Sequence, residues 1–313
     1  MNIYSQIKSN RRGTWLVVSV FIGLLIFIGL GVDYYYGGGL RIPLFTAIAL
    51  LIGLASSYAS YRYGDRLVLS STRAREPDSR DGREKQWQNV VEEAAIAAGL
   101  PLPKVYVIDD PDPNAFATGR DPAHSSIVAT KGLLETLNRE ELQGVAAHEM
   151  SHIKNYDIRL MLMVAVLVGS IALLADWAAR SMFYGRRRDR NSSAGAGGAA
   201  ALVMLVVWLV AVILAPILSQ LIAMCVSRKR EYLADASGAE LTRNPLALAA
   251  ALRKIDARPE PTRSINRGTA HLCIADPMGS AMGAKEGRLA DLFATHPPIN
   301  KRIEALNAMA YAK

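Results

Sequence analysis

Four long apolar runs constrain this chain more than any other feature of its sequence. They lie at residues 14–32, 42–58, 160–177 and 199–226. A helix needs about 20 apolar residues to cross the hydrocarbon core of a bilayer, and inside that core each backbone polar group must be bonded within its own element. The runs therefore predict four transmembrane helices, and they account for much of the 51% hydrophobic content of the 313 residues.

Basic residues around these runs predict the orientation of the chain. Lys and Arg cluster before the first run, after the second and after the fourth, and the positive-inside rule places such segments in the cytoplasm. One loop departs from the rule, because residues 180–198 are expected outside yet carry five Arg. A hairpin of the third and fourth runs that does not fully cross the membrane is therefore the alternative to two complete spans.

The net charge of +8 has two interpretations. It follows from the membrane topology, or it marks a nucleic-acid-binding surface, for which the sequence offers no basic patch interleaved with aromatic residues. We therefore expect the lipid bilayer as a partner and no nucleic acid. Cys225 and Cys273 do not make a disulfide framework, and they predict two reduced, buried thiols.

Residues 148–152, with the sequence H-E-M-S-H, form an H-E-x-x-H motif. On a helix, His148 and His152 share one face and can bind a single metal ion, while Glu149 can take a proton from a water on that metal. Asn138 is a suitable N-cap for such a helix. The motif predicts zinc-dependent hydrolysis, most often of peptide bonds, with one Zn²⁺ per chain.

Glu231 is the candidate for the third protein ligand that a catalytic zinc requires. It follows the fourth run as His152 precedes the third, so a membrane hairpin brings the two residues together. Asp235 lies four residues further on the same helix face, where it can accept the second N–H of a ligating histidine. The competing interpretation is that Glu231 and Asp235 pair with Arg228 or Arg230 at the surface.

These features predict an α+β membrane protein with four transmembrane helices, a mostly helical zincin-like catalytic domain and a small β-sheet on the cytoplasmic side. The predicted parts are a transmembrane hairpin at 1–63, a first catalytic part at 64–158, a second transmembrane hairpin at 159–226 and a second catalytic part at 227–313. Strands are expected at 104–108, 114–118 and 125–130, and helices at 83–98, 131–137 and from about 298. Residues 258–288 are rich in Pro, Gly and Arg, which predicts a mobile loop.

The motifs follow the order found in the HtpX heat-shock membrane proteases, and the chain resembles that family. After the H-E-x-x-H motif and two membrane segments comes E-Y-L-A-D at 231–235, while N-A-F-A-T-G at 114–119 resembles the family's edge-strand motif and T-H-P-P at 295–298 its C-terminal motif. The family is grouped with the CAAX-prenyl proteases among the gluzincin metallopeptidases. The resemblance implies a multi-pass protein of the bacterial inner membrane that cleaves misfolded membrane proteins at the cytoplasmic face.

The resemblance also implies roles for individual residues. For the metal ligands and the base Glu149 it agrees with the reasoning above. It implies that His296 and Arg302 stabilise the oxyanion, with a packed loop histidine and a surface arginine as the alternatives. It further implies an edge strand that pairs with an extended substrate, with a plain edge strand as the alternative. The residues of that strand are Asn114, Ala115, Phe116 and Ala117.

Two other functions are compatible with these motifs. One is CAAX-type processing of prenylated C-termini, although that group of proteases uses more spans than the four visible here. The other is a zinc-binding membrane scaffold or pseudoprotease without activity. The intact Glu149 argues against the second alternative, because a scaffold has no need of a general base.

Overall fold

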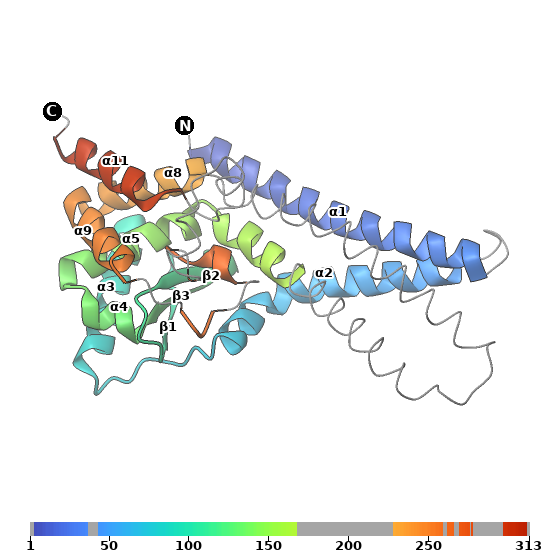
Figure 1. Ribbon diagram of the computed structural model, residues 1–313, viewed down its shortest axis with the longest axis horizontal. Coiled ribbons are helices and arrows are strands. Elements are labelled where there is room, and N and C mark those ends of the chain that lie inside the picture. Colours follow the sequence, from blue (N-terminus) through green and yellow to red (C-terminus); the bar gives the residue numbers. More distant parts are fainter. Residues whose placement is uncertain are drawn as a thin grey trace.

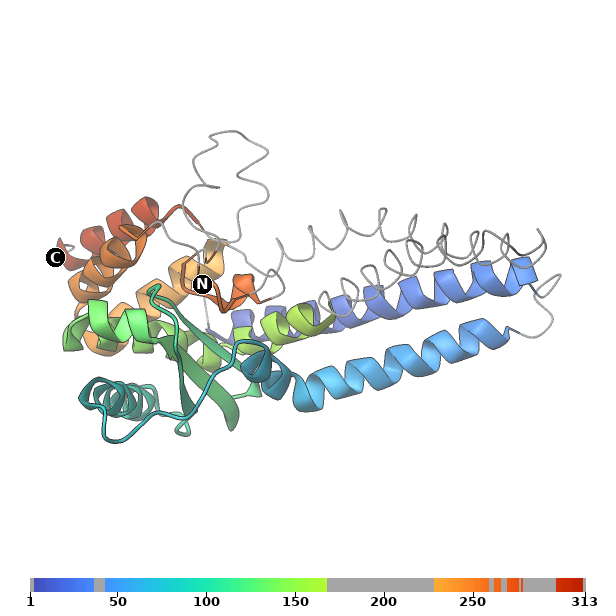
Figure 2. The same ribbon diagram turned by 60° about the horizontal axis from the view of Figure 1, so that its bottom comes forward.

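The computed structural model describes residues 3–36, 43–167, 228–258, 262–265, 269–275, 277 and 297–311. Two long helices, α1 (Ile3–Tyr36) and α2 (Leu44–Ser71), lie side by side and form a helical hairpin. The hairpin extends from a globular part that is built of shorter helices and one small sheet (Figures 1 and 2). The predicted mixture of many helices with a small sheet is therefore confirmed.

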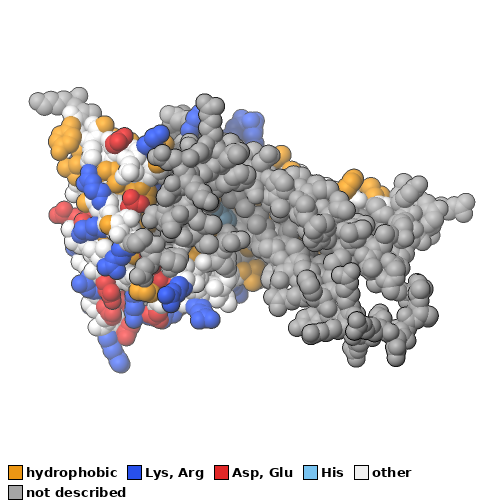
Figure 3. Space-filling model, viewed as in Figure 1, with side chains coloured by type: hydrophobic (Ala, Val, Ile, Leu, Met, Phe, Trp, Pro, Cys, Tyr) orange, Lys and Arg blue, Asp and Glu red, His pale blue; other side chains and the backbone are white. Residues whose placement is uncertain are grey.

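Large apolar side chains are exposed along the helical hairpin. Within the described residues, one helical stretch, Lys8–Phe27, is long and apolar enough to cross a membrane. The second predicted span falls in α2, where Leu51 is 70% and Tyr58 is 67% exposed. Charged side chains lie among apolar ones on the visible face of the globular part (Figure 3). The third run is described only to residue 167 and the fourth run lies outside the described residues, so the four-span arrangement stays a prediction.

A three-stranded sheet has the strand order β1-β3-β2. Strand β1 (Lys104–Ile108) runs parallel to β3 (His124–Thr130), and β2 (Ala115–Asp121) runs antiparallel to β3 with Phe116 opposite Val128. Strand β2 is thus an edge strand, as the sequence predicts, and it extends to Asp121 rather than ending at residue 118. The helix α3 (Gly82–Ala98) precedes the sheet and α4 (Lys131–Thr136) follows it.

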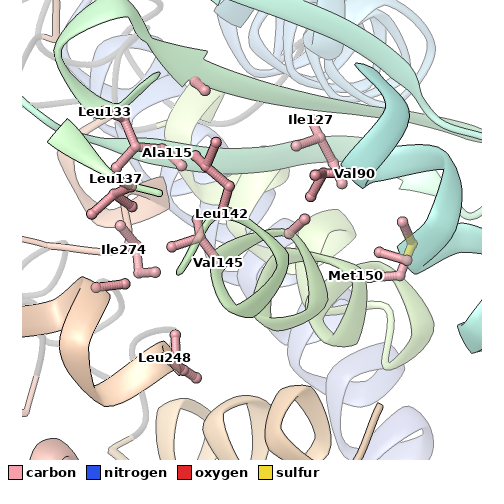
Figure 4. Packing of buried hydrophobic residues seen from close by; sticks show 14 of the residues in the cluster. Val90, Ala115, Ile127, Leu133, Leu137, Leu142, Val145, Met150, Leu248 and Ile274 are labelled. Carbon is pink, nitrogen blue, oxygen red and sulfur yellow. The ribbon is translucent and has the colours of Figure 1, made fainter. Parts of the chain in front are cut away.

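The H-E-x-x-H motif lies on α5 (Arg139–Lys154), which begins as predicted at Asn138. The Asn138 side chain accepts a hydrogen bond from the N–H of Glu141, and the Glu141 carboxylate accepts one from the N–H of Asn138. Apolar residues of α5 pack into the core beneath the sheet (Figure 4). These residues include Leu142, Val145 and Met150, all 0% exposed. Capping and burial together fix the position of the motif.

Two helices from the C-terminal part cross α5 at glycine residues. These are α8 (Arg228–Thr242) and α9 (Pro245–Asp256), and α11 (Ile299–Tyr311) packs beside α9. A Cβ atom at Gly238 in α8 would lie 2.9 Å from the backbone N of His148. Real Cβ atoms do not approach so closely, so the glycine allows α8 to contact α5 directly at the motif.

The described portion of 258–288 differs from the mobile loop that its composition predicts. Residues 262–265 and 269–275, including the 3-10 helix η1 (Ala270–Leu272), are mostly buried. The Asn114 amide donates to Thr262 Oγ1 and to the Ala275 carbonyl, both at 3.3 Å, and the N–H of Ile274 donates to the Ala115 carbonyl at 2.9 Å. Tertiary contacts therefore hold a segment that local composition alone suggests is loose.

Candidate metal centre

Three side chains from two helices converge inside the globular part. His148 and His152 project from α5, and Glu231 projects from the first turn of α8. The two Nε2 atoms are 3.2 Å apart. The carboxylate oxygens of Glu231 lie 3.7 Å from Nε2 of His148 and 3.6 Å from Nε2 of His152. All three residues are buried, with at most 5% exposure.

These separations fit a tetrahedral metal ion. Zinc binds imidazole nitrogen and carboxylate oxygen at about 2.0–2.2 Å, so tetrahedral geometry separates neighbouring ligand atoms by about 3.4 Å. The observed separations are 3.2, 3.6 and 3.7 Å. The cluster also supplies three protein ligands, which is the number that leaves one position for water or substrate at a catalytic site.

The first histidine is oriented from α8. Nδ1 of His148 lies 3.0 Å from Oδ1 of Asp235, which is the contact expected between a metal-bound histidine and a supporting carboxylate. Asp235 in turn accepts two hydrogen bonds from Arg302, from Nε at 2.8 Å and from Nη2 at 2.7 Å. Burial alone raises the pKa of Asp235, but the charge and hydrogen bonds of Arg302 outweigh it and hold this pKa at about 2.

The second histidine is oriented by a residue that the sequence reasoning missed. Nδ1 of His152 lies 3.0 Å from Oδ2 of Asp157, which is 1% exposed. Burial lowers the pKa of His152, but the hydrogen bond with Asp157 and the charge of Glu231 raise it to about 9. The available signal was an aspartate five residues beyond His152, ahead of the third apolar run at 160–177.

The two carboxylates determine what the ring nitrogens can do. A neutral imidazole that donates from Nδ1 presents a lone pair at Nε2. His148 and His152 would then direct two lone pairs and the Glu231 carboxylate at one another inside a buried space. Such a set of acceptors is unfavourable unless a cation or a proton lies among them. The residues therefore fit a bound metal ion.

Glu149 lies beside the cluster without being part of it. It is 1% exposed, and neither of its carboxylate oxygens has a hydrogen-bond partner among the described residues. Burial raises the pKa of Glu149, and the nearby charge of Glu231 acts in the same direction. A buried carboxyl group that lacks a protein partner and has a raised pKa is suited to exchange a proton with a bound water or substrate.

The chain is similar to one peptidase family over most of its length. The pattern of Peptidase family M48 matches residues 81–310. A protease HtpX homolog of Dictyoglomus turgidum is 45% identical over 98% of this chain and 94% of its own. A protease HtpX homolog of Caldanaerobacter subterraneus is 43% identical over 98% of both chains. The chain belongs to peptidase family M48. It is therefore a metalloprotease of the HtpX-like group.

A solved structure shares the fold of this chain. The crystal structure of S. mikatae Ste24p superposes with a TM-score of 0.50 at 18% sequence identity, over 97% of this chain and 67% of that one. At this identity the likeness concerns the fold alone. It supports the overall fold of this chain and no particular role.

Of the two residues predicted to stabilise the oxyanion, the structure describes Arg302. Arg302 of this M48 protease is 0% exposed, and it donates to Asp235 and to the Ile274 carbonyl. Its Nη1 also lies 3.4 Å from Glu231. Through these contacts Arg302 holds Asp235, the carboxylate that faces His148. An oxyanion role for Arg302 stays a prediction. His296 lies outside the described residues.

The predicted substrate strand is only partly open. The Asn114 side chain is hydrogen-bonded to Thr262 and Ala275, and the Ala115 carbonyl accepts from Ile274. Phe116 pairs with Cys273 in an antiparallel bridge. The chain's own segment therefore lies beside these positions, and pairing of a substrate with Asn114–Ala117 stays a prediction.

Proposed function

We propose that this metalloprotease is a zinc endopeptidase of the bacterial inner membrane that cleaves misfolded or damaged membrane proteins at the cytoplasmic face, as part of membrane protein quality control under stress. The observation that supports it best is the buried cluster of His148, His152 and Glu231, which is connected to α1 through Asp157. These three residues would hold the zinc ion. A metal site next to the helical hairpin would reach substrate loops close to the membrane surface more readily than it would reach soluble proteins far from the membrane.

Glu149 has the central role in the proposed reaction. When bound, zinc lowers the pKa of a water and polarises a carbonyl group. The Glu149 carboxylate takes the proton of the attacking water, because it is buried beside the ligands with no protein partner among the described residues. Once the peptide bond breaks, the same carboxyl group gives this proton to the leaving amine.

An extended substrate is proposed to pair with the outer edge of β2. The Asn114 carbonyl accepts from the N–H of Thr130, so Asn114 faces β3, whereas the Ala115 carbonyl accepts from Ile274 on the outer side. Backbone groups alternate along a strand, which directs those of Ala117 outward as well. Recognition through backbone groups makes cleavage broad in sequence but requires an unfolded segment.

The deciding experiment is the cleavage of an unfolded membrane protein by the purified full-length chain in detergent, with zinc or with a chelator. Glu149→Gln is expected to keep zinc and fold but to lose cleavage by about 10²–10⁴-fold, because an amide cannot accept the proton. A tightly folded soluble protein serves as the control substrate and is expected to remain intact. Near wild-type turnover by Glu149→Gln, or equal cleavage of the folded control, contradicts the proposal.

The pairing of substrate with β2 has its own test. Ala117→Pro removes an outward N–H at the end of the bridge between Phe116 and Cys273, without removing a donor to β3. The loss of one backbone hydrogen bond, about 0.5–1.5 kcal/mol, together with the altered backbone, is expected to slow cleavage by about tenfold. Zinc content and the thermal midpoint are measured in parallel to show that the metal site and the sheet remain intact. Unchanged cleavage by such a folded variant excludes this edge as the substrate site.

A further inference from the structure

Helix α1 reaches the metal centre through one buried side chain. Asn10 lies in the apolar stretch Lys8–Phe27 and is 2% exposed. Its Nδ2 atom donates to the carbonyl of Asn155 at 2.9 Å and to Oδ1 of Asp157 at 2.5 Å. The other oxygen of Asp157 lies 3.0 Å from Nδ1 of His152. One amide of α1 therefore joins the end of α5 to the carboxylate that orients a metal ligand.

The turn that carries Asp157 adopts a strained conformation. Tyr156 has a φ of 60°, a left-handed backbone that is unfavourable for a residue other than glycine. The guanidinium carbons of Arg11 and Arg159 lie 5.2 and 5.0 Å from the centre of the Tyr156 ring. A strained turn keeps one conformation only when its surroundings hold it. Asn10 and Arg11 supply such contacts from α1.

The packing of α1 keeps Asn10 in register with this turn. Residues 157–167 continue as a helix after the turn, and α1 packs along them. A Cβ atom at Gly13 would lie 3.1 Å from Leu160, so the two helices are close one turn beyond Asn10. Val17 and Phe21 extend the contact further along the same cluster. A shift of α1 would therefore move Asn10 relative to Asp157.

We infer that Asn10 is a positioning residue for the metal ligand His152 and acts through Asp157, so that the placement of the first membrane helix sets the affinity and geometry of the metal site. The inference rests on the proposed function, because it assumes that the site binds zinc. Loss of a carboxylate that supports a metal-bound histidine weakens metal binding by about 10–100-fold. Asn10 is one contact further away, and we expect about 3–10-fold for its removal.

A double-mutant cycle tests whether Asn10 acts through Asp157. The zinc dissociation constant of the full-length chain in detergent is measured by competition with a chelator for Asn10→Ala, Asp157→Ala and the double variant. The Asn10→Ala change is expected to weaken binding in the wild-type background and to add no further loss in the Asp157→Ala background. Asn307→Ala is the matched control, because its side-chain oxygen accepts from the exposed Arg253, and it is expected to bind zinc as tightly as wild type.

Two further measurements separate positioning from a general effect on the fold. Asn10→Ala is expected to change the visible absorption of the Co²⁺-substituted protein, which reports ligand geometry, and to lower kcat with KM unchanged. If Asn10→Ala does not fold, Asn10→Ser retains one hydrogen-bonding group and is expected to bind zinc with an affinity between those of wild type and Asp157→Ala. Wild-type affinity in the folded Asn10 variant, or an equal loss in both backgrounds, overturns the inference. A wild-type chain that binds no zinc contradicts the proposed function instead.

Discussion

The two histidines of the metal centre are oriented by different parts of the chain. His148 faces Asp235, whose carboxylate is held by two hydrogen bonds from the buried Arg302 of the C-terminal helix. His152 faces Asp157, whose carboxylate is held by the neutral amide of Asn10 at the start of the membrane-type helix α1. One support is a charged pair inside the globular part, and the other is a neutral contact with the helical hairpin.

This difference shows how a metal site between membrane helices and a soluble domain can depend on both. The His148 support depends on the folding of the globular part, because its carboxylate and its arginine come from α8 and α11. The His152 support depends on where α1 lies. Damage to the first support is therefore expected to affect stability and metal binding together, whereas damage to the second is expected to affect mainly the metal.

The largest expected effect comes from breaking the His148 support. Arg302→Ala leaves Asp235 and the nearby Glu231 as buried carboxylates without their cation, and breaking a buried ion pair in this way costs about 3–5 kcal/mol. We expect a lower free energy of unfolding and loss of most of the bound zinc. Chemical denaturation and metal analysis measure the two effects, with the exposed Arg253→Ala as control. A stable, zinc-loaded Arg302→Ala that lacks only cleavage would instead support the predicted oxyanion role.

A smaller effect is expected from moving α8 away from His148. Gly238→Ala places a methyl group 2.9 Å from the backbone N of His148, and overpacking of this kind costs about 1–3 kcal/mol. Because Glu231 and Asp235 lie on the same face of α8, zinc affinity is expected to fall as well. Gly82→Ala is the matched control, since a Cβ there meets no atom within 4 Å. Equal thermal midpoints and zinc affinities for the two variants would show that α8 can shift without cost.

Local patterns in the sequence were sufficient to predict the metal ligands and the support of His148 by Asp235. Helix periodicity places His148 with His152 and Glu231 with Asp235, and the cap at Asn138 fixes where the motif helix begins. These predictions depend on residues within two turns of one another. The order of the apolar runs then indicates that the ends of two helices meet.

The remaining contacts around the metal centre join segments that are far apart in the sequence. Asn10 and Asp157 are 147 residues apart, and no local pattern pairs them. A surface position was one interpretation of Arg302 from the sequence, whereas the packing of α11 beside α8 buries it completely. Composition likewise predicts a loose segment at 269–275, whereas pairing with β2 holds it. In each case tertiary packing determines where the residue lies, and such packing produces no regular spacing in a single sequence.

The smallest expected effect concerns pH and separates the two supports most directly. Burial opposes charge on His152, but the hydrogen bond with Asp157 and the charge of Glu231 raise its pKa from 6.5 to about 9. In the metal-free protein, this raised pKa contributes stability that is present below about pH 6.5 and is lost as the pH rises through about 9. Zinc requires the neutral ring, so its binding is expected to tighten over the same interval.

Asp157→Asn removes the carboxylate that contributes most to this raised pKa. We therefore expect the thermal midpoint of the metal-free variant to fall less than that of wild type between pH 6.5 and 9, by about 2–4 °C for each kcal/mol involved. The gain in midpoint on adding zinc is also expected to vary less with pH. Asn307→Ala, a change at a side chain that accepts from the exposed Arg253, is the control, and it is expected to leave the pH dependence of wild type. Identical slopes for Asp157→Asn and wild type would mean that Asp157 does not set the proton affinity of His152, and the two supports would then differ only in geometry.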